Sequence, residues 1–455
     1  MLNIKLPKII YKISNKLNQL DAKAILVGGS LRDYFLNIKC KDYDIEVYGL
    51  DSVDTLIDIL SKFGTVNLVG KSFGVLKFNY DGDEYDFSFP RRESKSALGH
   101  CGFDIECDGF LNFEEASSRR DFTINSMGYD IIEDKLLDPH NGYDDIKNRT
   151  IRYVNKRSFS EDALRVYRAI GFSARFEFDI DDDTKRLCKN IVDTQEFREL
   201  SKERVFIEFN KLLLKSSNPS IGFNLMREFG ILKYFPPLKN IIDIPQDKRY
   251  HPEGDVWTHT MMAIDAMAKF ENKNLKLLYA TLCHDFGKAT HTQIYPDKIS
   301  AIGHEKAGIE PTIEFLSSLT NEHKFINSIV PLVEHHLKPS IYFRNSAKNS
   351  TIRKLATKVN IEELIVVAKA DFLGRRTKEA REGVYKAGIW LLAKAKELEV
   401  DKEPLKPLIQ GRDLILLGVE PSPQFRVILD KIYQMQLDGI VDSREKALEE
   451  VKNII

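Results

Sequence analysis

A glycine turn and a pair of alternating aspartates most constrain the fold of this chain. Segment 27–33 (VGGSLRD) reads as a strand end, a glycine turn and a helix start, and segment 41–47 (KDYDIEV) reads as a second strand. Residues i and i+2 of a strand point to one face, so Asp42 and Asp44 bring two carboxylates together. A divalent cation relieves their repulsion. The backbone N–H groups at Gly28 and Gly29 suit a polyphosphate, and the combination indicates nucleotidyl transfer.

Two further residues extend this constellation. Arg32 follows the turn, where a guanidinium can reach a triphosphate bidentately. Asp86 lies in a later expected strand, YDFSF at 85–89, and offers a third carboxylate. Three carboxylates position two Mg²⁺ ions, one for an attacking 3′-hydroxyl and one for the leaving pyrophosphate. The alternative is an ordinary turn with solvated surface acids.

Adjacent arginines also call for an anionic partner. Arg119 and Arg120 precede the segment FTIN at 122–125, which looks buried. Arginines in such a place are costly unless they meet negative groups, and triphosphate or ribose contacts would satisfy them. The alternative is an ion pair with Glu114 or Glu115.

A third feature concerns the recognition of bases. Asp162 and Arg165 lie three residues apart in an expected helix and share a face. Cytosine and adenine each offer an amino donor beside a ring-nitrogen acceptor, which an aspartate and an arginine complement. Guanine and uracil present the opposite order and would leave both side chains unpaired. The alternative is an i,i+3 surface ion pair.

Composition narrows the class of protein. A chain of 455 residues is expected to form two to four domains, and 43% apolar with 30% charged residues fits a soluble globular protein. Because the net charge is −1, any bound nucleic acid must be held by local patches of basic residues. Five scattered cysteines without C-x-x-C spacing argue against disulfides and zinc. Without a signal core or an apolar run near 20 residues, we expect a cytoplasmic protein with no membrane contact.

The chain changes character near residue 155. Before it, strands alternate with helices, and after it the pattern is helical almost throughout. Residues 160–162 are expected to start a helix, 92–114 to form an extended loop, and 251–255 to form a loop between helices. The expected strands are 24–27, 43–47, 65–69, 74–80 and 84–89.

Three motifs carry a resemblance to a known family. In their order and spacing, the motifs resemble those of class II tRNA nucleotidyltransferases, the CCA-adding enzymes. The motifs are GGSLRD with DYD, SRRDFTINSM at 118–127 and EDALRVYR at 161–168. The resemblance implies an α+β fold with a small mixed β-sheet head and a helical neck, body and tail. We expect the head at 1–150, the neck at 151–215, the body at 216–385 with an HD domain at about 257–375, and the tail at 386–455.

The resemblance also implies an activity and roles for single residues. It implies template-independent addition of CCA to tRNA 3′ ends from CTP and ATP, with Mg²⁺ at Asp42 and Asp44 assisted by Asp86. In this interpretation Arg120 contacts the nucleotide, Asp162 and Arg165 select the base, and Arg168 stays nearby. One departure is Gly171, where many relatives carry another arginine. The loop at 92–114 matches one that helps the family switch from adding C to adding A.

A second constellation lies in the helical part. It resembles the pattern of HD phosphohydrolases and consists of His259, His284 with Asp285, and Asp371. The imidazole and carboxylate ligands of that pattern suit a divalent transition metal. Seven of the ten histidines lie between residues 259 and 336, and the additional candidate ligands or phosphate contacts are His304, His335 and His336. The segment HPEGDVWTHT at 251–260 resembles CCA enzymes with an HD domain, whose relatives hydrolyse phosphate esters of nucleotides and RNA ends. The alternative is an inactive HD fold that supports tRNA.

Several functions stay open at this point. The nearest alternative function is that of a bacterial poly(A) polymerase. Enzymes that add only CC or only A are the next alternatives. From other classes, an HD phosphohydrolase with a nucleotide-binding head and a non-catalytic RNA-binding scaffold remain, although neither needs paired metal carboxylates. The expected partners are the tRNA acceptor stem, CTP and ATP, without an obligate protein partner.

Overall fold

The computed structural model describes residues 4–39, 42–69, 75–95 and 103–455. The chain divides into two compact units. The first consists of Met1–Leu212 with Asn224–Ile231, and the second of Leu213–Phe223 with Leu232–Ile455. Within the described ranges, no helix has the length and apolar character needed to cross a membrane.

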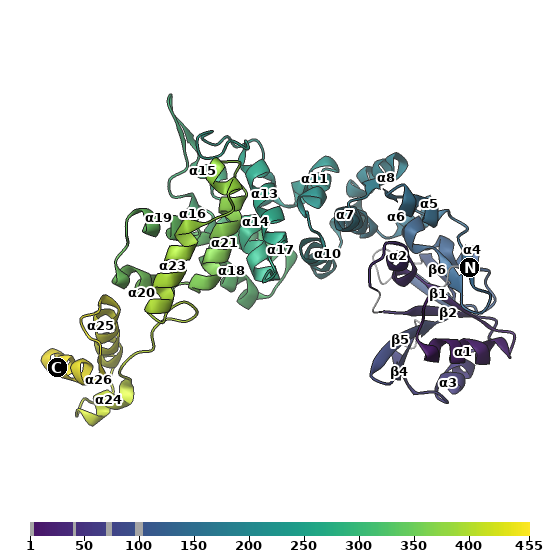
Figure 1. Ribbon diagram of the computed structural model, residues 1–455, viewed down its shortest axis with the longest axis horizontal. Coiled ribbons are helices and arrows are strands. Elements are labelled where there is room, and N and C mark those ends of the chain that lie inside the picture. Colours follow the sequence, from purple (N-terminus) through teal and green to yellow (C-terminus); the bar gives the residue numbers. More distant parts are fainter. Residues whose placement is uncertain (1–3, 40–41, 70–74, 96–102) are drawn as a thin grey trace. The chain divides into compact units, whose positions relative to one another are not determined.

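A seven-stranded mixed sheet forms the base of the first unit (Figure 1). Its strand order is β3-β4-β5-β2-β1-β8-β9. The central strands β2 and β5 pair in parallel, which sets Asp44 opposite Asp86. The bounds are β1 (Lys23–Val27), β2 (Asp44–Tyr48), β3 (Thr65–Val69), β4 (Val75–Tyr80), β5 (Asp83–Ser88), β8 (Gly128–Asp130) and β9 (Lys135–Leu137). All five predicted strands are therefore confirmed, with ends shifted by one residue at most.

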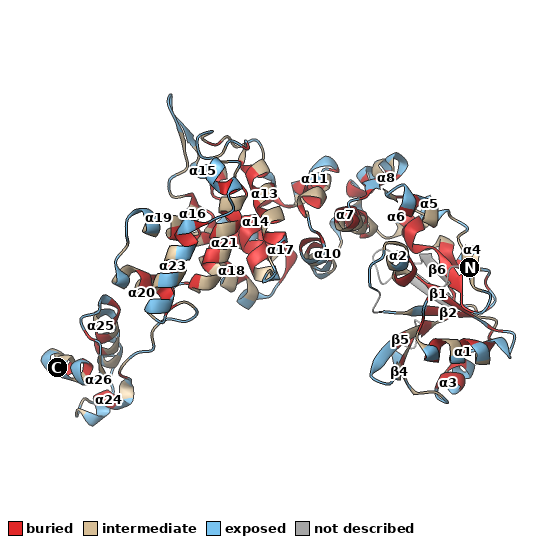
Figure 2. Cartoon of the chain, in the orientation of Figure 1, coloured by how far each residue is buried: buried red, intermediate tan, exposed pale blue. Residues whose placement is uncertain are grey.

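Alternating apolar residues explain why these strands pair. Ile45 and Val47 of β2 and Phe78 of β4 are fully buried, and Figure 2 shows the buried residues along the central strands. Each such side chain contributes about 1.5–3 kcal/mol on burial. Helices α1 (Lys8–Asn18) and α3 (Val53–Leu60) pack against each other and against the sheet. The short helix α2 (Gly29–Phe35) follows β1 directly.

The expected extended loop at 92–114 was wrong in part. Strands β6 (Arg91–Lys95) and β7 (Phe103–Cys107) pair antiparallel there, and helix α4 (Phe113–Ser118) begins before the expected loop ends. The Arg-Glu-Ser-Lys segment of β6 carries no apolar alternation, whereas Phe103, Ile105 and Cys107 of β7 alternate with acidic residues, a signal that the prediction did not use. The sequence Gly-His-Cys at 99–101 lies outside the described residues.

Helices complete the first unit. The predicted helix start at 160–162 was wrong, because one helix ends at Glu161 and the next begins at Arg165, and Asp162 between them has extended backbone. The bounds are η1 (Thr123–Asn125), α5 (Gly142–Lys147), β10 (Thr150–Ile151), α6 (Lys156–Glu161), α7 (Arg165–Phe176), β11 (Asp179–Ile180), α8 (Asp182–Val192), α9 (Gln195–Arg198), α10 (Lys202–Lys215) and α11 (Ser220–Glu228). The last two helices straddle the boundary between the units.

The second unit is helical apart from one short hairpin. Helices α13, α14, α18 and α21 pack together, and their facing sides are buried (Figure 2). The bounds are η2 (Ile231–Tyr234), α12 (Pro236–Lys239), α13 (Val256–Ala268), α14 (Leu275–Cys283), α15 (Lys288–His291), β12 (Gln293–Ile294), β13 (Ile299–Ser300), α16 (His304–Ala307), α17 (Ile309–Leu319), α18 (His323–His335), α19 (Lys338–Arg344), α20 (Asn349–Ala356), α21 (Ile361–Leu373), α22 (Lys378–Arg381) and α23 (Lys386–Glu397). The predicted loop at 251–255 is confirmed, since α13 begins at Val256.

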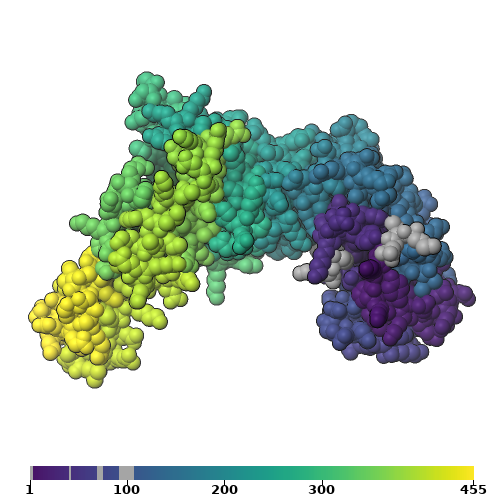
Figure 3. Space-filling model, viewed as in Figure 1, coloured from purple at the N-terminus to yellow at the C-terminus, as the bar shows by residue number. Residues whose placement is uncertain are grey.

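The final helices form a group of their own. They are α24 (Gly411–Leu416), α25 (Gln424–Asp438) and α26 (Arg444–Ile454). Leu414, Ile432 and Val451 bury one side chain from each helix in a separate small core. The end of the chain that contains these helices is yellow in Figure 3. The predicted α+β architecture, with a mixed-sheet head and helices beyond it, is confirmed.

Candidate functional site

Three carboxylates lie close together where β1 ends and β2 begins, beside the neighbouring strand β5. Asp44 begins β2 beside Asp86 of β5, and the exposed Asp42 lies two residues earlier in the chain. Gly28 is required here, because its φ is +75° and a Cβ would lie 3.2 Å from Asp44 Oδ2. Solvent reaches Asp44, yet partial burial and the charge of Asp86 raise its pKa to about 6. Asp86 Oδ1 is buried and accepts no hydrogen bond from the described residues. Lys77 and Arg120 offset only part of the negative charge of this corner, which fits a divalent cation.

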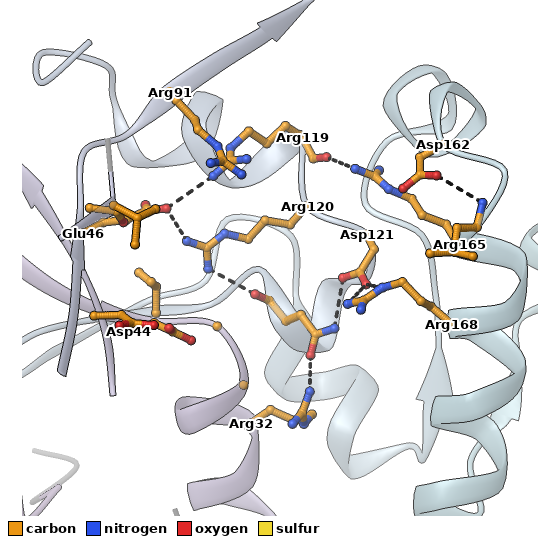
Figure 4. Close-up of a pocket in the computed structure, with 18 of the residues that line it drawn as sticks. Arg32, Asp44, Glu46, Arg91, Arg119, Arg120, Asp121, Asp162, Arg165 and Arg168 are labelled. Carbon is orange, nitrogen blue, oxygen red and sulfur yellow. Dashed lines mark hydrogen bonds and ion pairs between the residues drawn. The ribbon is translucent and has the colours of Figure 1, made fainter. Parts of the chain in front are cut away.

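Glu46, two residues further along β2, holds the two adjacent arginines. Its Oε1 accepts from Arg120 Nη2 at 2.8 Å and lies 3.5 Å from Arg119 Nη2 (Figure 4). Burial alone would raise the pKa of Glu46, but these guanidinium charges outweigh it and the pKa is lowered. Glu46 is therefore an ion-pair partner of both arginines, and it is a residue that the sequence analysis did not consider for this role.

Arg32 is buried at the pocket and is held by contacts with other residues of the protein. Its Nε donates to Asp33 Oδ1 at 2.8 Å and its Nη1 to Asn125 Oδ1 at 2.6 Å. The guanidinium also lies over the rings of Phe172 and Phe176. Arg32 lines the pocket, but its donors are engaged by the protein, in contrast to the expected bidentate reach toward a triphosphate.

A series of hydrogen bonds connects Arg32 to Arg168. Asn125 Nδ2 donates to Asp121 Oδ1 at 3.0 Å, and Asp121 Oδ2 accepts from Arg168 Nε at 2.7 Å. Burial of Asp121 works against ionisation, but the charge of Arg168 outweighs it and lowers the pKa of the carboxyl. The network fixes Arg168 at the pocket wall, where the sequence placed it (Figure 4).

The expected base-selecting pair lines the same pocket. Asp162 is not paired with Arg165 in an i,i+3 ion pair. Its carboxylate is held by Arg204 Nη2 at 3.1 and 3.2 Å, and its Oδ1 also accepts from Leu164 N. Arg165 Nη2 donates to the carbonyl of Arg119 at 2.7 Å, while Nη1 is buried without a hydrogen-bond partner among the described residues. An unused buried donor beside a fixed carboxylate is suited to the edge of a base.

One cavity of about 680 Å³ unites these parts. Asp44, Asp86, the two adjacent arginines and the base-selecting pair line it, as does Gly28 at the glycine turn, whereas Asp42 is not among its lining residues. Arg204 was missed, because nothing in the helical pattern distinguishes it among 67 basic residues. Gly171 lies in α7, and a Cβ there would meet no atom within 4 Å.

A second cluster lies in the core of the second unit. His259 comes from α13, Asp371 from α21, and His284 with Asp285 from the turn after α14. His259 Nε2 lies 3.0 Å from Asp371 Oδ1 and 3.3 Å from His284 Nε2, and His284 Nε2 lies 3.2 Å from Asp285 Oδ2. The four predicted residues are thus brought together and buried. Both side chains of the His-Asp pair point into the cluster from this turn.

Hydrogen bonds fix how the histidines face the cluster. His284 Nδ1 lies 2.7 Å from the carbonyl of Thr281, and His259 Nδ1 lies 2.8 Å from Glu253 Oε1. Both contacts require a proton on Nδ1, and they turn the two Nε2 atoms toward each other and toward carboxylates. Such an arrangement favours a cation between them, and a carboxylate behind a histidine is typical of metal sites. The candidate ligand atoms of His259, His284 and Asp371 lie within 4.8 Å of one another.

Two cations border the cluster. Lys288 Nζ donates to Asp285 Oδ2 at 2.7 Å, and Arg375 Nη2 donates to both oxygens of Asp371 at 2.8 and 2.9 Å. Sequence reasoning missed both, although each follows its aspartate by three or four residues, which is a usable signal on a helix. It also missed Glu253, whose role depends on a contact with His259 that the structure alone shows.

The remaining candidate histidines separate into two groups. His304 and His336 line a cavity of about 830 Å³ together with Asp285 and Asp371. His335 is not among the lining residues, because its side chain leaves α18 in another direction from that of His336. Only the first two are therefore brought to the cluster.

Three sequence families match this chain. The Poly A polymerase head domain matches residues 24–152, the probable RNA and SrmB-binding site of polymerase A matches 177–242, and the HD domain matches 256–375. The first covers the carboxylate corner and the last covers the buried cluster. The fold and sites thus define a protein with a polymerase-type nucleotidyltransferase head and an HD domain.

Full-length relatives narrow this class. The Multifunctional CCA protein of Pasteurella multocida is 31% identical over 447 residues, covering 95% of this chain and 99% of that protein. The Multifunctional CCA protein of Mannheimia succiniciproducens is 34% identical over 368 residues, covering 77% and 84%. The chain belongs to the multifunctional CCA protein family.

Solved structures share the fold. The CCA-adding enzyme of Bacillus stearothermophilus in complex with CTP superposes with a TM-score of 0.71 at 20% identity, covering 99% of this chain and 98% of that one. The Thermotoga maritima CCA-adding enzyme complexed with tRNA gives 0.61 at 23% identity, covering 99% and 97%.

Proposed function

We propose that this protein adds CCA to tRNA 3′ ends from CTP and ATP, for maturation and repair in the cytoplasm. The observation that carries the proposal is one cavity that Asp44, Asp86 and the Asp162–Arg165 pair line together. A binding module needs no cluster of carboxylates beside a base-reading pair. We further propose a head at 1–150, a neck at 151–215, a body at 216–385 and a tail at 386–455.

The carboxylate corner would hold Mg²⁺ through Asp42, Asp44 and Asp86. Mg²⁺ bound there supplies an activated 3′-hydroxyl and neutralises the charge of the leaving pyrophosphate. The residues of the chain orient the nucleotide. Arg119 and Arg120 present a cationic wall on the same side as Asp44 and suit a triphosphate.

Base selection follows from the fixed pair. Arg204 holds the Asp162 carboxylate, which accepts from the amino group of cytosine or adenine. Arg165 uses one nitrogen on the Arg119 carbonyl and keeps Nη1 for a ring acceptor. Uracil and guanine would place a carbonyl against Asp162, which leaves a buried group unpaired at a cost of about 1–3 kcal/mol.

A second activity is favoured by the buried cluster. We propose that the HD domain hydrolyses phosphate esters of nucleotides or RNA ends with a divalent transition metal. The imidazoles of His259 and His284 with the carboxylates of Asp285 and Asp371 fit such a metal, and Lys288 and Arg375 suit a phosphate at the cavity wall.

Nucleotide competition tests the base-selecting pair. With tRNA that ends before CCA, the wild-type protein should incorporate CTP and then ATP and reject UTP and GTP. Asp162→Ala should reduce this discrimination, whereas the control Asp183→Ala, an exposed carboxylate on α8, should retain it. Equal selectivity of all three proteins would contradict the assignment. Incorporation of ATP alone would favour a poly(A) polymerase or an A-only enzyme.

A further inference from the structure

We propose that Glu46 sets the affinity of the nucleotide site for polyphosphates, because its charge cancels part of the positive charge that Arg119 and Arg120 offer to phosphate. In this interpretation the carboxylate weakens the binding of the pyrophosphate product, so that pyrophosphate leaves between successive additions. The inference rests on the proposed nucleotidyl transfer and deepens it. It gives Glu46 a role different from that of Asp44, the candidate metal ligand two residues earlier on the same strand.

Both oxygens of the Glu46 carboxylate are held by other side chains. Oε1 accepts from Arg120 Nη2 at 2.8 Å and lies 3.5 Å from Arg119 Nη2. Oε2 accepts from the hydroxyl of Tyr48 at 2.8 Å. Glu46 is only 3% exposed, yet it lines the cavity together with both arginines (Figure 4). A negative charge is therefore fixed beside the guanidinium groups in the wall of the nucleotide site.

Arg120 does not depend on Glu46 alone for its position. Its Nη1 donates to the carbonyl of Asn125 at 3.1 Å, and this backbone acceptor remains when residue 46 is changed. Glu46→Gln keeps the other contacts as well, since an amide oxygen accepts from Arg120 and an amide N–H donates to the Tyr48 hydroxyl. The charge of Glu46 can therefore be separated experimentally from its part in holding the arginine.

An acid in this place opposes the binding of a triphosphate. The nucleotide and the pyrophosphate product share the β- and γ-phosphates, so arginines that contact these phosphates bind substrate and product alike. Such uniform binding lowers KM without raising kcat, and slow product release can limit turnover. Each nucleotide added to a tRNA releases one pyrophosphate. A carboxylate beside the arginines weakens this shared binding, and one unit charge in a partly solvated site corresponds to about a tenfold change in affinity.

The variant Glu46→Gln tests the role of the charge. Pyrophosphate is titrated into the protein at constant Mg²⁺ and followed by calorimetry, and KM values are measured with tRNA that ends before CCA. We expect Glu46→Gln to bind pyrophosphate about tenfold more tightly than the parent, with KM values for CTP and ATP lowered by a similar factor. The preference for CTP over UTP should not change, because Asp162 and Arg165 are untouched.

Two further variants control for the loss of charge and for folding. Glu133→Gln removes the same charge from an exposed position outside the cavity, where the carboxylate pairs with Lys23, and should leave pyrophosphate affinity unchanged. Glu46→Val also removes the charge, with a side chain that suits a strand, and should tighten pyrophosphate binding as Glu46→Gln does. The Tm of each variant reports whether it is folded.

The direction of the change decides the outcome. Equal or weaker pyrophosphate binding by folded Glu46→Gln would overturn the inference, because a residue that only positions the arginines should loosen phosphate binding when it is altered. A parent protein that incorporates no nucleotide into tRNA would overturn the proposed transfer instead. The calorimetric comparison still decides the role of Glu46 in that case, so the two failures are distinguishable.

Discussion

Neighbouring acids on one strand have opposite electrostatic roles. Asp44 and Glu46 point to the same face of β2, but Glu46 is neutralised by Arg119 and Arg120, whereas Asp44 faces another carboxylate. The pKa of Glu46 is lowered and that of Asp44 is raised to about 6. One residue thus anchors the arginine wall, and the other is left to bind a cation.

Asp44→Asn should abolish nucleotide addition and yet stabilise the metal-free protein at pH 8. The folded-state pKa of about 6 exceeds the ordinary value of 3.8, so the charged carboxylate costs stability above pH 6. The gain in Tm over wild type should shrink as the pH falls from 6 toward 4. Mg²⁺ should raise the Tm of the wild type and not that of the variant. A lower Tm for Asp44→Asn at pH 8 without metal would contradict this electrostatic account.

Arg204→Lys should weaken base selection, because lysine keeps the charge but cannot hold both oxygens of Asp162. A charge-assisted hydrogen bond of about 1.5 kcal/mol corresponds to a roughly tenfold loss in the ratio of kcat/KM for CTP over UTP. Steady-state kinetics with each nucleotide measures this ratio. Arg186→Lys, an exposed arginine on α8, is the matched control. An unchanged ratio in Arg204→Lys would show that Arg204 does not position Asp162.

At the scale of elements, the sheet could be predicted and the turns could not. Strands β1 to β5 carry apolar runs bounded by turn residues, so sequence alone located them. The break at Asp162 carries no glycine or proline, and it depends on contacts of that carboxylate with Leu164 and Arg204. The pairing of β6 with β7 joins a polar segment to one that alternates apolar and acidic residues, and only the second carries a strand signal. Residues in motifs could be proposed for the site from the sequence, whereas Arg204 and Glu253 depend on tertiary contacts.

Gly171→Arg should stabilise α7, because arginine has a higher helix propensity than glycine by about 0.8 kcal/mol. The position has open space, so no neighbour must shift. We expect the first unit to melt about 2–3 °C higher. The control is Gly388→Ala in α23, where a Cβ would lie 2.6 Å from the Tyr385 ring and should lower the Tm. A lower Tm for Gly171→Arg would show that this glycine has a structural role.

At the scale of the whole molecule, each compact unit contains one site. The carboxylate corner and the base-selecting pair lie entirely in the first unit, and the histidine cluster lies entirely in the second. The sites share no residue, which makes two separable activities the natural expectation.

Variants in the two units should therefore act independently. Asp42→Ala should abolish nucleotide addition and leave metal-dependent phosphate release unchanged. His284→Ala combined with Asp285→Ala should abolish metal-dependent phosphate release and leave nucleotide addition unchanged, because it removes two buried candidate ligands of the second unit. Assays of both activities on both variants check this, and loss of both activities in either well-folded variant would contradict separate sites.

The products formed on a truncated tRNA test the central claim most directly. The purified protein is incubated with tRNA that lacks its last three nucleotides, together with CTP, ATP and Mg²⁺, and the 3′ ends are sequenced. The structure predicts ends that carry CCA and then stop. Homopolymeric A tails, or products that stop at CC, would contradict the account.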